Sequence, residues 1–229
     1  SLDQELLKPY FKLENVIGGV FEIANKLFDL QFEEVFNIDK YHEDVKTYNV
    51  TDLNGNFIAV FYADFHPRKG KRNGAWMTSY KSQQIKNNMN ERPHISIVCN
   101  FTKPTKTKPS LLTFNEVTTL FHEFGHGLHH LLTKIDVPAV AGINGVEWDA
   151  VELPSQFMEN YCWQKDALRL FAKHYQTGEA LPDDLFDKMT LAKNFQTALQ
   201  MLRQIEFSLF DIKLHQSQNL KYASEIQSI

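Results

Sequence analysis

The sequence has few cysteines, little net charge and no long apolar run, and each scarcity argues against a class of protein. Two cysteines, Cys99 and Cys162, lie in apolar segments without a CxxC partner, which favours free thiols in a reducing compartment over a single disulfide. No apolar run approaches the roughly 18 residues that indicate a membrane-spanning helix, so no membrane partner is expected. A net charge of −4 argues against a nucleic-acid binder, whose surface would be strongly basic.

The start of the chain lacks two further features. The segment SLDQELLKPYF has neither the charged-then-apolar pattern of a signal peptide nor an initiator methionine. We therefore expect a cytoplasmic protein that is either processed or cut from a longer chain. With 43% hydrophobic and 23% charged residues, the 229 residues can build a sizeable core and remain soluble.

The rest of the chain predicts an α+β fold. Residues 1–44 are expected to be helical, since apolar residues recur at helical spacing over 13–30. Residues 45–102 are rich in β-branched and aromatic residues and predict a small, mainly antiparallel sheet, in which Asn54-Gly55 marks a hairpin. The basic stretch 66–74 is expected to be a solvated loop. Strands followed by helices, without βαβ alternation, are typical of the α+β class.

Residues 113–217 are predicted to be helical. Thr113 and Glu116 form a capping box, which fixes the start of a helix over 113–133. A second helix is expected to begin between Asp149 and Pro154 and to run on through SQFMENYCWQKDALRLFAKHY. A last long helix is expected to cover about 191–217.

The helix predicted over 113–133 carries an H-E-x-x-H motif, formed by His122, Glu123 and His126. The i, i+4 spacing brings two imidazoles to one helix face, close enough to bind one tetrahedral Zn²⁺. Glu123 then lies beside the metal rather than on it, where it can act as a general base toward a water molecule.

A catalytic zinc has a third protein ligand, and two residues are candidates. His129 shares the helix face of His122 and His126 but lies about 10 Å along the axis from His122, a span that one zinc ion does not easily bridge. Glu152 begins a new helix, which could cross the first and bring a carboxylate to the metal.

Five separate segments, in the same order, resemble the thimet oligopeptidase family of zinc peptidases, and most closely its bacterial oligopeptidase A branch. They are FYADFHPRKGKRNGAWM, RPHISIVCNFT, FHEFGHGLHH, GVEWDAVELPSQFMENYCW and RQIEFSLFDIKLH. The resemblance covers nearly the whole chain, but members of this family are much longer. It therefore implies that residues 1–229 are part of a catalytic domain, with the zinc site in the helical stretch 113–217.

The resemblance implies a cytoplasmic zinc endopeptidase that hydrolyses short peptides. It implies the zinc ligands His122, His126 and Glu152 with Glu123 as general base, and so agrees with Glu152 rather than His129 as the third ligand. Further residues are then candidates for orienting the ligands or supporting the cleft wall: Asp149, Ser155, Glu159, His129 and His130.

Three further expectations follow. In H-E-x-x-H peptidases the substrate commonly lies as an added strand along a sheet edge, and we expect HISIVCNF (94–101) to be that edge. Gly125 and Gly127, each costing about 1 kcal/mol in a helix interior, are expected to let another backbone approach. The helical lobe and the oxyanion-stabilising loop of the family are not found in this sequence, so the alternative is a folded zinc- or peptide-binding fragment with little or no turnover. The sequence predicts no oligomeric state.

Overall fold

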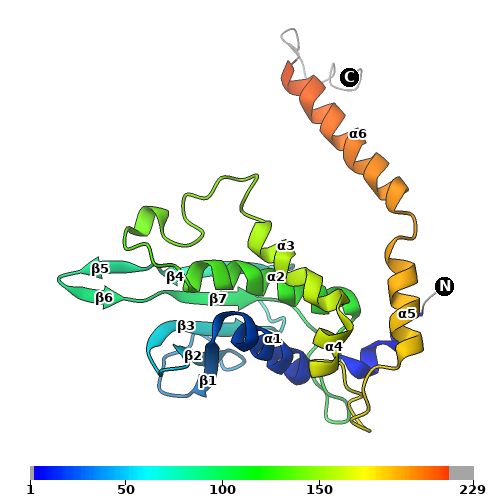
Figure 1. Cartoon of the computed structure of the whole chain (residues 1–229), viewed down its shortest axis with the longest axis horizontal. Helices are drawn as coiled ribbons and strands as arrows, with labels where there is room; N and C mark the ends of the chain where they lie inside the picture. The colour runs from blue at the N-terminus through cyan, green and yellow to red at the C-terminus, as the bar shows by residue number, and fades with distance from the viewer. Residues whose placement is uncertain (1–2, 217–229) are drawn as a thin grey trace. The chain divides into compact units, whose positions relative to one another are not determined.

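The computed structural model describes residues 3–216. They divide into two parts, Asp3–Phe186 and a second part that begins at Asp187 (Figure 1). The first part combines a five-stranded sheet with helices, which confirms the α+β class. Every helix within residues 3–216 is too short or too polar to span a membrane.

The five strands are arranged in the order β1-β2-β3-β7-β4. Their bounds are Leu30–Val35 for β1, Lys46–Asp52 for β2, Phe57–Asp64 for β3, Trp76–Lys81 for β4 and His94–Val98 for β7. Neighbouring strands are antiparallel except β3 and β7, so the prediction of a mainly antiparallel sheet is confirmed. Two short strands, β5 (Gln84–Lys86) and β6 (Met89–Glu91), form a separate hairpin between β4 and β7 in the chain (Figure 1).

The predicted hairpin at Asn54-Gly55 is confirmed, since it joins β2 to β3. The carboxylate of Asp52 accepts hydrogen bonds from the backbone N–H groups of Asn54 and Asn56, at 2.9 and 2.8 Å. Gly55 has a φ of 80°, a left-handed conformation that glycine adopts without steric cost.

The prediction that HISIVCNF forms the free edge of the sheet is wrong. Strand β7 is paired on both sides: Ile95 lies opposite Phe61 in β3 and opposite Ser79 in β4. All four residues 95–98 are buried, and three of them are apolar, which is typical of such an inner strand. The free edge next to the histidine-bearing helix belongs to β4.

The described residues contain six α-helices and four short 3₁₀ segments. The α-helices are α1 (Leu13–Phe28), α2 (Phe114–Leu131), α3 (Leu153–Glu159), α4 (Lys165–Phe171), α5 (Asp183–Lys193) and α6 (Thr197–Gln216). The 3₁₀ segments are Gln4–Leu6, Lys8–Tyr10, Pro138–Val140 and Asn160–Trp163.

Three helix predictions need correction. Residues 1–44 contain α1 but also strand β1, so they are not helical throughout. The second predicted helix is interrupted between α3 and α4, because Gln164 has an extended backbone with φ −101° and ψ 122°. The last predicted helix is also interrupted, because Gln196 has a φ of 58° between α5 and α6. Its final position, 217, lies outside the described residues.

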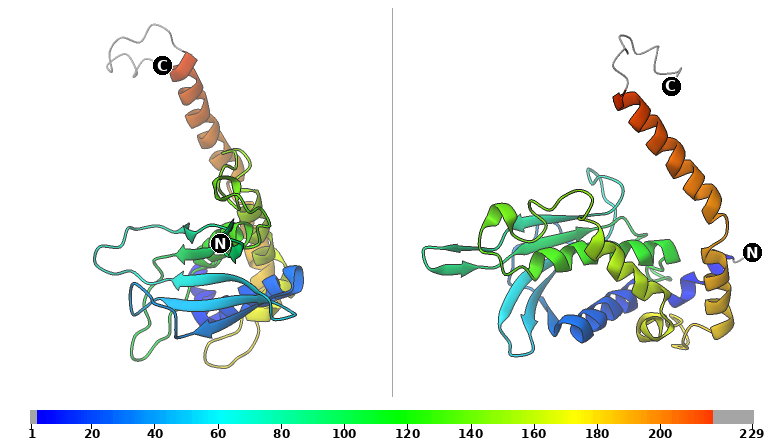
Figure 2. Two further views of the ribbon diagram at one scale, coloured as in Figure 1. Left: turned by 90° about the vertical axis from the view of Figure 1, so that its left-hand side faces the viewer. Right: turned by 45° about the horizontal axis from the view of Figure 1, so that its top comes forward.

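Aromatic rings form the centre of the core between helices and sheet. Phe21 of α1 stacks on Phe32 of β1 at a centroid distance of 4.1 Å, and Phe124 of α2 lies 5.9 Å from Phe61 of β3. Phe21 and Phe124 both contact Phe61 and each other, so α1 and α2 pack on the same face of the sheet (Figure 2). The core thereby fixes where α2 lies on the sheet.

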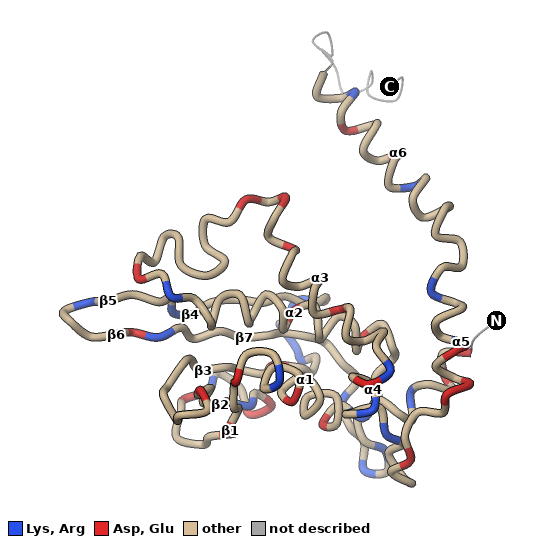
Figure 3. The backbone as a smooth tube through the Cα atoms, in the orientation of Figure 1, with Lys and Arg blue, Asp and Glu red and all other residues tan. Residues whose placement is uncertain are grey.

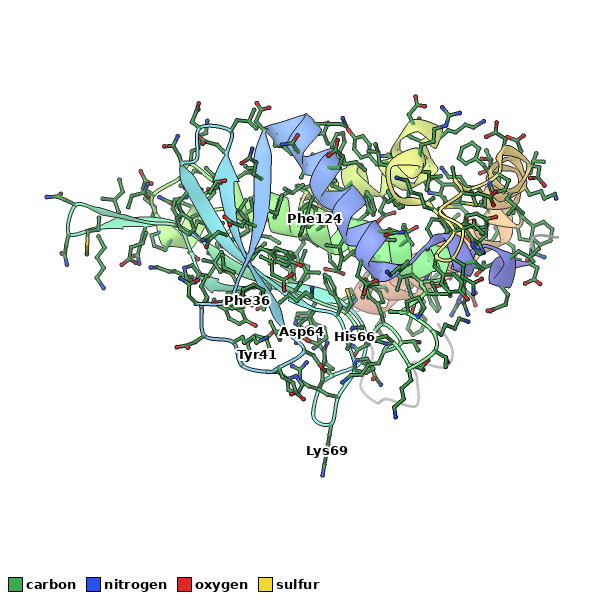
Figure 4. All side chains as sticks on the ribbon, turned by 90° about the horizontal axis from the view of Figure 1, so that it is seen from below. Phe36, Tyr41, Asp64, His66, Lys69 and Phe124 are labelled. Atoms are coloured by element: carbon green, nitrogen blue, oxygen red, sulfur yellow. The ribbon has the colours of Figure 1, made fainter. Side chains whose placement is uncertain are left out.

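The prediction of a solvated basic loop is wrong for two of its four cations. Lys69 and Arg72 are exposed, but the side chain of Lys71 is only 3% exposed and donates to the carboxylate of Asp64 at 2.9 Å. Arg68 forms two hydrogen bonds to the same carboxylate, at 2.6 and 2.9 Å. Figure 4 shows Asp64 beside Tyr41, which also donates to it, whereas Lys69 points away at the tip of the loop. The buried Asp64 therefore holds this loop against the sheet.

Candidate metal centre

Helix α2 begins as its capping box predicts. The Thr113 hydroxyl accepts from the backbone N–H of Glu116 at 3.2 Å, and the Glu116 carboxylate accepts from the backbone N–H of Thr113 at 2.7 Å. Leu120 and Phe124 are buried on the side of α2 that faces the core. The motif histidines therefore lie on a helix whose start and rotation are both fixed.

Helix α3 crosses α2 at Gly125. A Cβ atom at this position would lie 2.5 Å from the carbonyl oxygen of Pro154 and 2.6 Å from the Cα of Ser155. The expectation that glycine admits another backbone is thus confirmed for Gly125. At Gly127 the close neighbours are the side chains of Ile95 and Ile97, so that glycine admits the sheet and not a second helix.

The crossing brings His122, His126 and Glu152 together. The Nε2 atoms of the two histidines lie 3.2 and 3.1 Å from the same carboxylate oxygen of Glu152. One potential ligand atom from each residue lies within 4.8 Å of the others. Ligands of one tetrahedral zinc ion are about 3.3 Å apart when each bond is about 2.0–2.1 Å long, so both the spacing and the donor set fit zinc.

Two hydrogen bonds orient these side chains. Nδ1 of His122 lies 2.5 Å from the Glu159 carboxylate, which fixes the proton on Nδ1 and leaves Nε2 as a lone-pair donor. The Ser155 hydroxyl lies 2.8 Å from both the carboxylate and the backbone carbonyl of Glu152. Asp149 is exposed in the turns before α3. Three acidic residues, Glu147, Asp149 and Glu152, lie in the stretch that enters α3 (Figure 3), and a negative potential there favours a cation.

The pKa values of the two central carboxylates shift in opposite directions. Burial raises the pKa of Glu123, which is 8% exposed, although the positive potential of His122 and the backbone of Met77 in β4 oppose the shift. Burial also disfavours ionisation of Glu152, but the hydrogen bond from Ser155 and the neighbouring His126 outweigh it and hold its pKa below the ordinary value. Glu152 is therefore suited to bind a cation, and Glu123 to accept a proton.

His129 lies outside this group of three. It lines a cavity of about 410 Å³ beside the helix crossing, together with apolar side chains that include Leu128, Leu132, Phe157 and Met158. Burial lowers the pKa of His129, so the imidazole is held neutral. The structure therefore does not bring the alternative third ligand to His122 and His126.

Sequence reasoning did not single out Ser79 of β4. Met77 lies close enough to Glu123 to influence its pKa, and Ser79 contacts His130 in the last turn of α2. The place of β4 in the sheet could not be predicted, because strand order depends on pairing between distant segments.

A histidine pair on one helix that converges with a glutamate from a crossing helix, with a second glutamate alongside, is the architecture of a metallopeptidase centre. The chain belongs to peptidase family M3, whose model matches residues 1–228.

Relatives agree with this assignment and with the resemblance to bacterial oligopeptidase A. The chain is 47% identical over 227 residues to oligopeptidase A of Haemophilus influenzae, covering 99% of this chain and 33% of that protein. It is 48% identical to oligopeptidase A of Escherichia coli, covering 94% of this chain and 32% of that protein. Saccharolysin of Saccharomyces cerevisiae is 39% identical, with 98% and 33% covered. The chain thus spans about a third of the length of these relatives.

Proposed function

We propose that the protein is a zinc-dependent endopeptidase that hydrolyses peptide bonds in short oligopeptides. The observation that carries this proposal is the convergence of both histidine Nε2 atoms on one carboxylate oxygen of Glu152. The printed name of two relatives, oligopeptidase A, supports the reaction class and the size of the substrate.

His122, His126 and Glu152 would hold the zinc ion. When bound there, zinc would polarise the scissile carbonyl and lower the pKa of a water molecule. Glu159 keeps His122 in the tautomer that a ligand requires, and Ser155 keeps the Glu152 carboxylate turned toward the two histidines.

Glu123 is the general base in this proposal. Its carboxylate accepts a proton from the attacking water as the new C–O bond forms, and delivers that proton to the leaving nitrogen as the C–N bond breaks. Burial strengthens it as a base, because a raised pKa means a higher affinity for the proton.

The free edge of β4 is where we place the peptide. This strand lies beside α2, and its backbone groups on the side away from β7 are not used by the sheet. Backbone hydrogen bonds to an added strand hold a peptide without reading its sequence, which suits an enzyme that acts on varied short peptides.

A cytoplasmic location and peptides as the substrate partner belong to the same proposal. Both cysteines are free and buried, which agrees with a reducing compartment. The alternative is a zinc- or peptide-binding fragment without turnover, and the partial coverage of the relatives is the observation that favours it.

Zinc stoichiometry and cleavage of a fluorogenic peptide test the proposal together. We expect one zinc per chain for the unmodified protein and for Glu123→Gln, and cleavage that Glu123→Gln abolishes. Glu43→Gln is the matched control, because Glu43 is exposed, outside the ligand group and outside the acidic segment that enters α3. Zinc binding without cleavage by the unmodified chain would support the fragment alternative. Failure to bind zinc would refute both the zinc peptidase and the zinc-binding form of the fragment.

A further inference from the structure

His130 joins three elements of the structure. It lies in the last turn of α2 and is 0% exposed. Its Nε2 is 2.9 Å from the hydroxyl of Ser79 in β4, and its Nδ1 is 3.2 Å from the backbone nitrogen of Ile143, in the segment between α2 and α3. One imidazole thus contacts the free-edge strand and the segment that leads to Glu152.

The direction of each hydrogen bond follows from its neighbour. The backbone N–H of Ile143 can only donate, so Nδ1 of His130 accepts and carries no proton. The ring proton is therefore on Nε2 and is donated to Ser79, whose own hydroxyl donates to the carbonyl of Lys81 at 3.2 Å. Burial lowers the pKa of His130, in agreement with a neutral ring.

The His130 ring also packs closely against the backbone of Gly142. A Cβ atom at Gly142, where φ is 61°, would lie 2.6 Å from Nδ1 and 2.7 Å from the Cα of His130. The backbone N–H of Gly142 donates to the Thr133 hydroxyl at 3.0 Å, which fixes the same segment a second time.

Strand β4 needs this attachment at Ser79. The pairing of β4 with β7 is regular from Trp76 to Ser79, but the register shifts between Ser79 and Lys81. Such a bulge interrupts the ladder and bends the strand, so the ladder alone fixes the local backbone less firmly. Met77, beside Glu123, is two residues before Ser79 and therefore on the same face of the strand.

We propose that His130 is a positioning residue, which holds the free edge of β4 at a fixed place relative to the helix that carries His122 and His126. It acts through its contacts with Ser79 and the backbone of Lys81 in β4, and not by contact with substrate or metal. The assignment of a peptide to this edge rests on the proposed function, whereas the hydrogen bond between His130 of α2 and Ser79 of β4 does not.

The first test measures peptide and zinc affinity of the zinc-loaded chain. The probe is a fluorescein-labelled octapeptide with a reduced central bond, followed by anisotropy. We expect Ser79→Ala and His130→Leu to weaken peptide binding about tenfold, since one buried hydrogen bond contributes about 1.4 kcal/mol at its upper range. Zinc affinity should change less than about threefold, because the α2–α3 crossing holds the ligands.

A conservative variant separates positioning from a general structural role. His130→Gln can place its amide N–H where Nε2 lies and donate to Ser79, so it should bind peptide within about twofold of the unmodified chain. His215→Gln, at an exposed position in α6, is the control. Unchanged peptide affinity in folded Ser79→Ala would overturn the proposal, and so would an equal loss of zinc affinity.

A second readout keeps the two proposals distinguishable. If the unmodified chain binds zinc but not the octapeptide, the proposed substrate site is refuted. Hydrogen exchange then tests by itself whether His130 holds β4 in place through Ser79. Amides of Trp76–Lys81 should exchange about tenfold faster in Ser79→Ala, while those of α1 remain unchanged. Equal exchange of β4 in both proteins would overturn the positioning role.

Discussion

Gly125→Ala changes one hydrogen to a methyl group at the crossing of α2 and α3. The added carbon would lie 2.5 Å from the carbonyl oxygen of Pro154 and 2.6 Å from the Cα of Ser155. Ordinary carbon contacts are about 3.5–4.0 Å, so the helices must separate by about 1 Å. Both obstacles are backbone atoms, and no side-chain rotation can relieve the contact.

Separating α2 from α3 is expected to change the free energy of unfolding only a little and the zinc affinity much more. Alanine gains about 1 kcal/mol of helix propensity, and overpacking costs about 1–3 kcal/mol, so unfolding should become easier by only about 0–2 kcal/mol. Metal–ligand distances tolerate about 0.2 Å, far less than the expected movement of Glu152. We therefore expect zinc affinity to fall at least tenfold while the chain stays folded.

Equilibrium dialysis gives the zinc affinity, and urea denaturation of the metal-free chain gives the stability. Gly18→Ala is the matched control: Gly18 lies inside α1, has no heavy atom within 4 Å of its added Cβ, and should gain up to about 1 kcal/mol without affecting zinc. If Gly125→Ala binds zinc as tightly as Gly18→Ala, then the close crossing does not determine the position of Glu152, and the reasoning fails.

The remaining predictions concern the third ligand and a buried ion pair. Glu152→Ala should weaken zinc binding in dialysis far more than His129→Ala, and equal losses would reverse the ligand assignment. Asp64→Asn should cost about 3 kcal/mol at pH 7, because it leaves Lys71 buried and unpaired. Despite its burial, Asp64 has a lowered pKa through Arg68 and Lys71, so its carboxylate stabilises the fold above the unfolded-state pKa of about 4. This contribution is lost as pH falls through the lower folded-state pKa. Urea denaturation should therefore show the free energies of unfolding of the unmodified protein and Asp64→Asn converging in acid. A difference that stays constant with pH would contradict a lowered pKa of Asp64.

Local features of the candidate site could be predicted because the residues that determine them are close in sequence. The capping box needs only Thr113 and Glu116, and the i, i+4 spacing of His122 and His126 follows from the helix itself. The hairpin at Gly55 likewise depends on a few neighbouring residues.

Tertiary structure decided the features that depend on distant segments. Helix spacing already disfavoured His129 as a ligand, but the place of Glu152 beside the two histidines depends on the crossing of α3 over α2 at Gly125. The inner position of β7 arises from pairing with β3 and β4 on either side. Lys71 is buried between Asp64 at the end of β3 and the backbone carbonyl of Cys99, which lies 28 residues further along the chain. The sequence alone therefore determined which side chains share one face of a helix. Packing between elements determined which distant side chains lie beside that face.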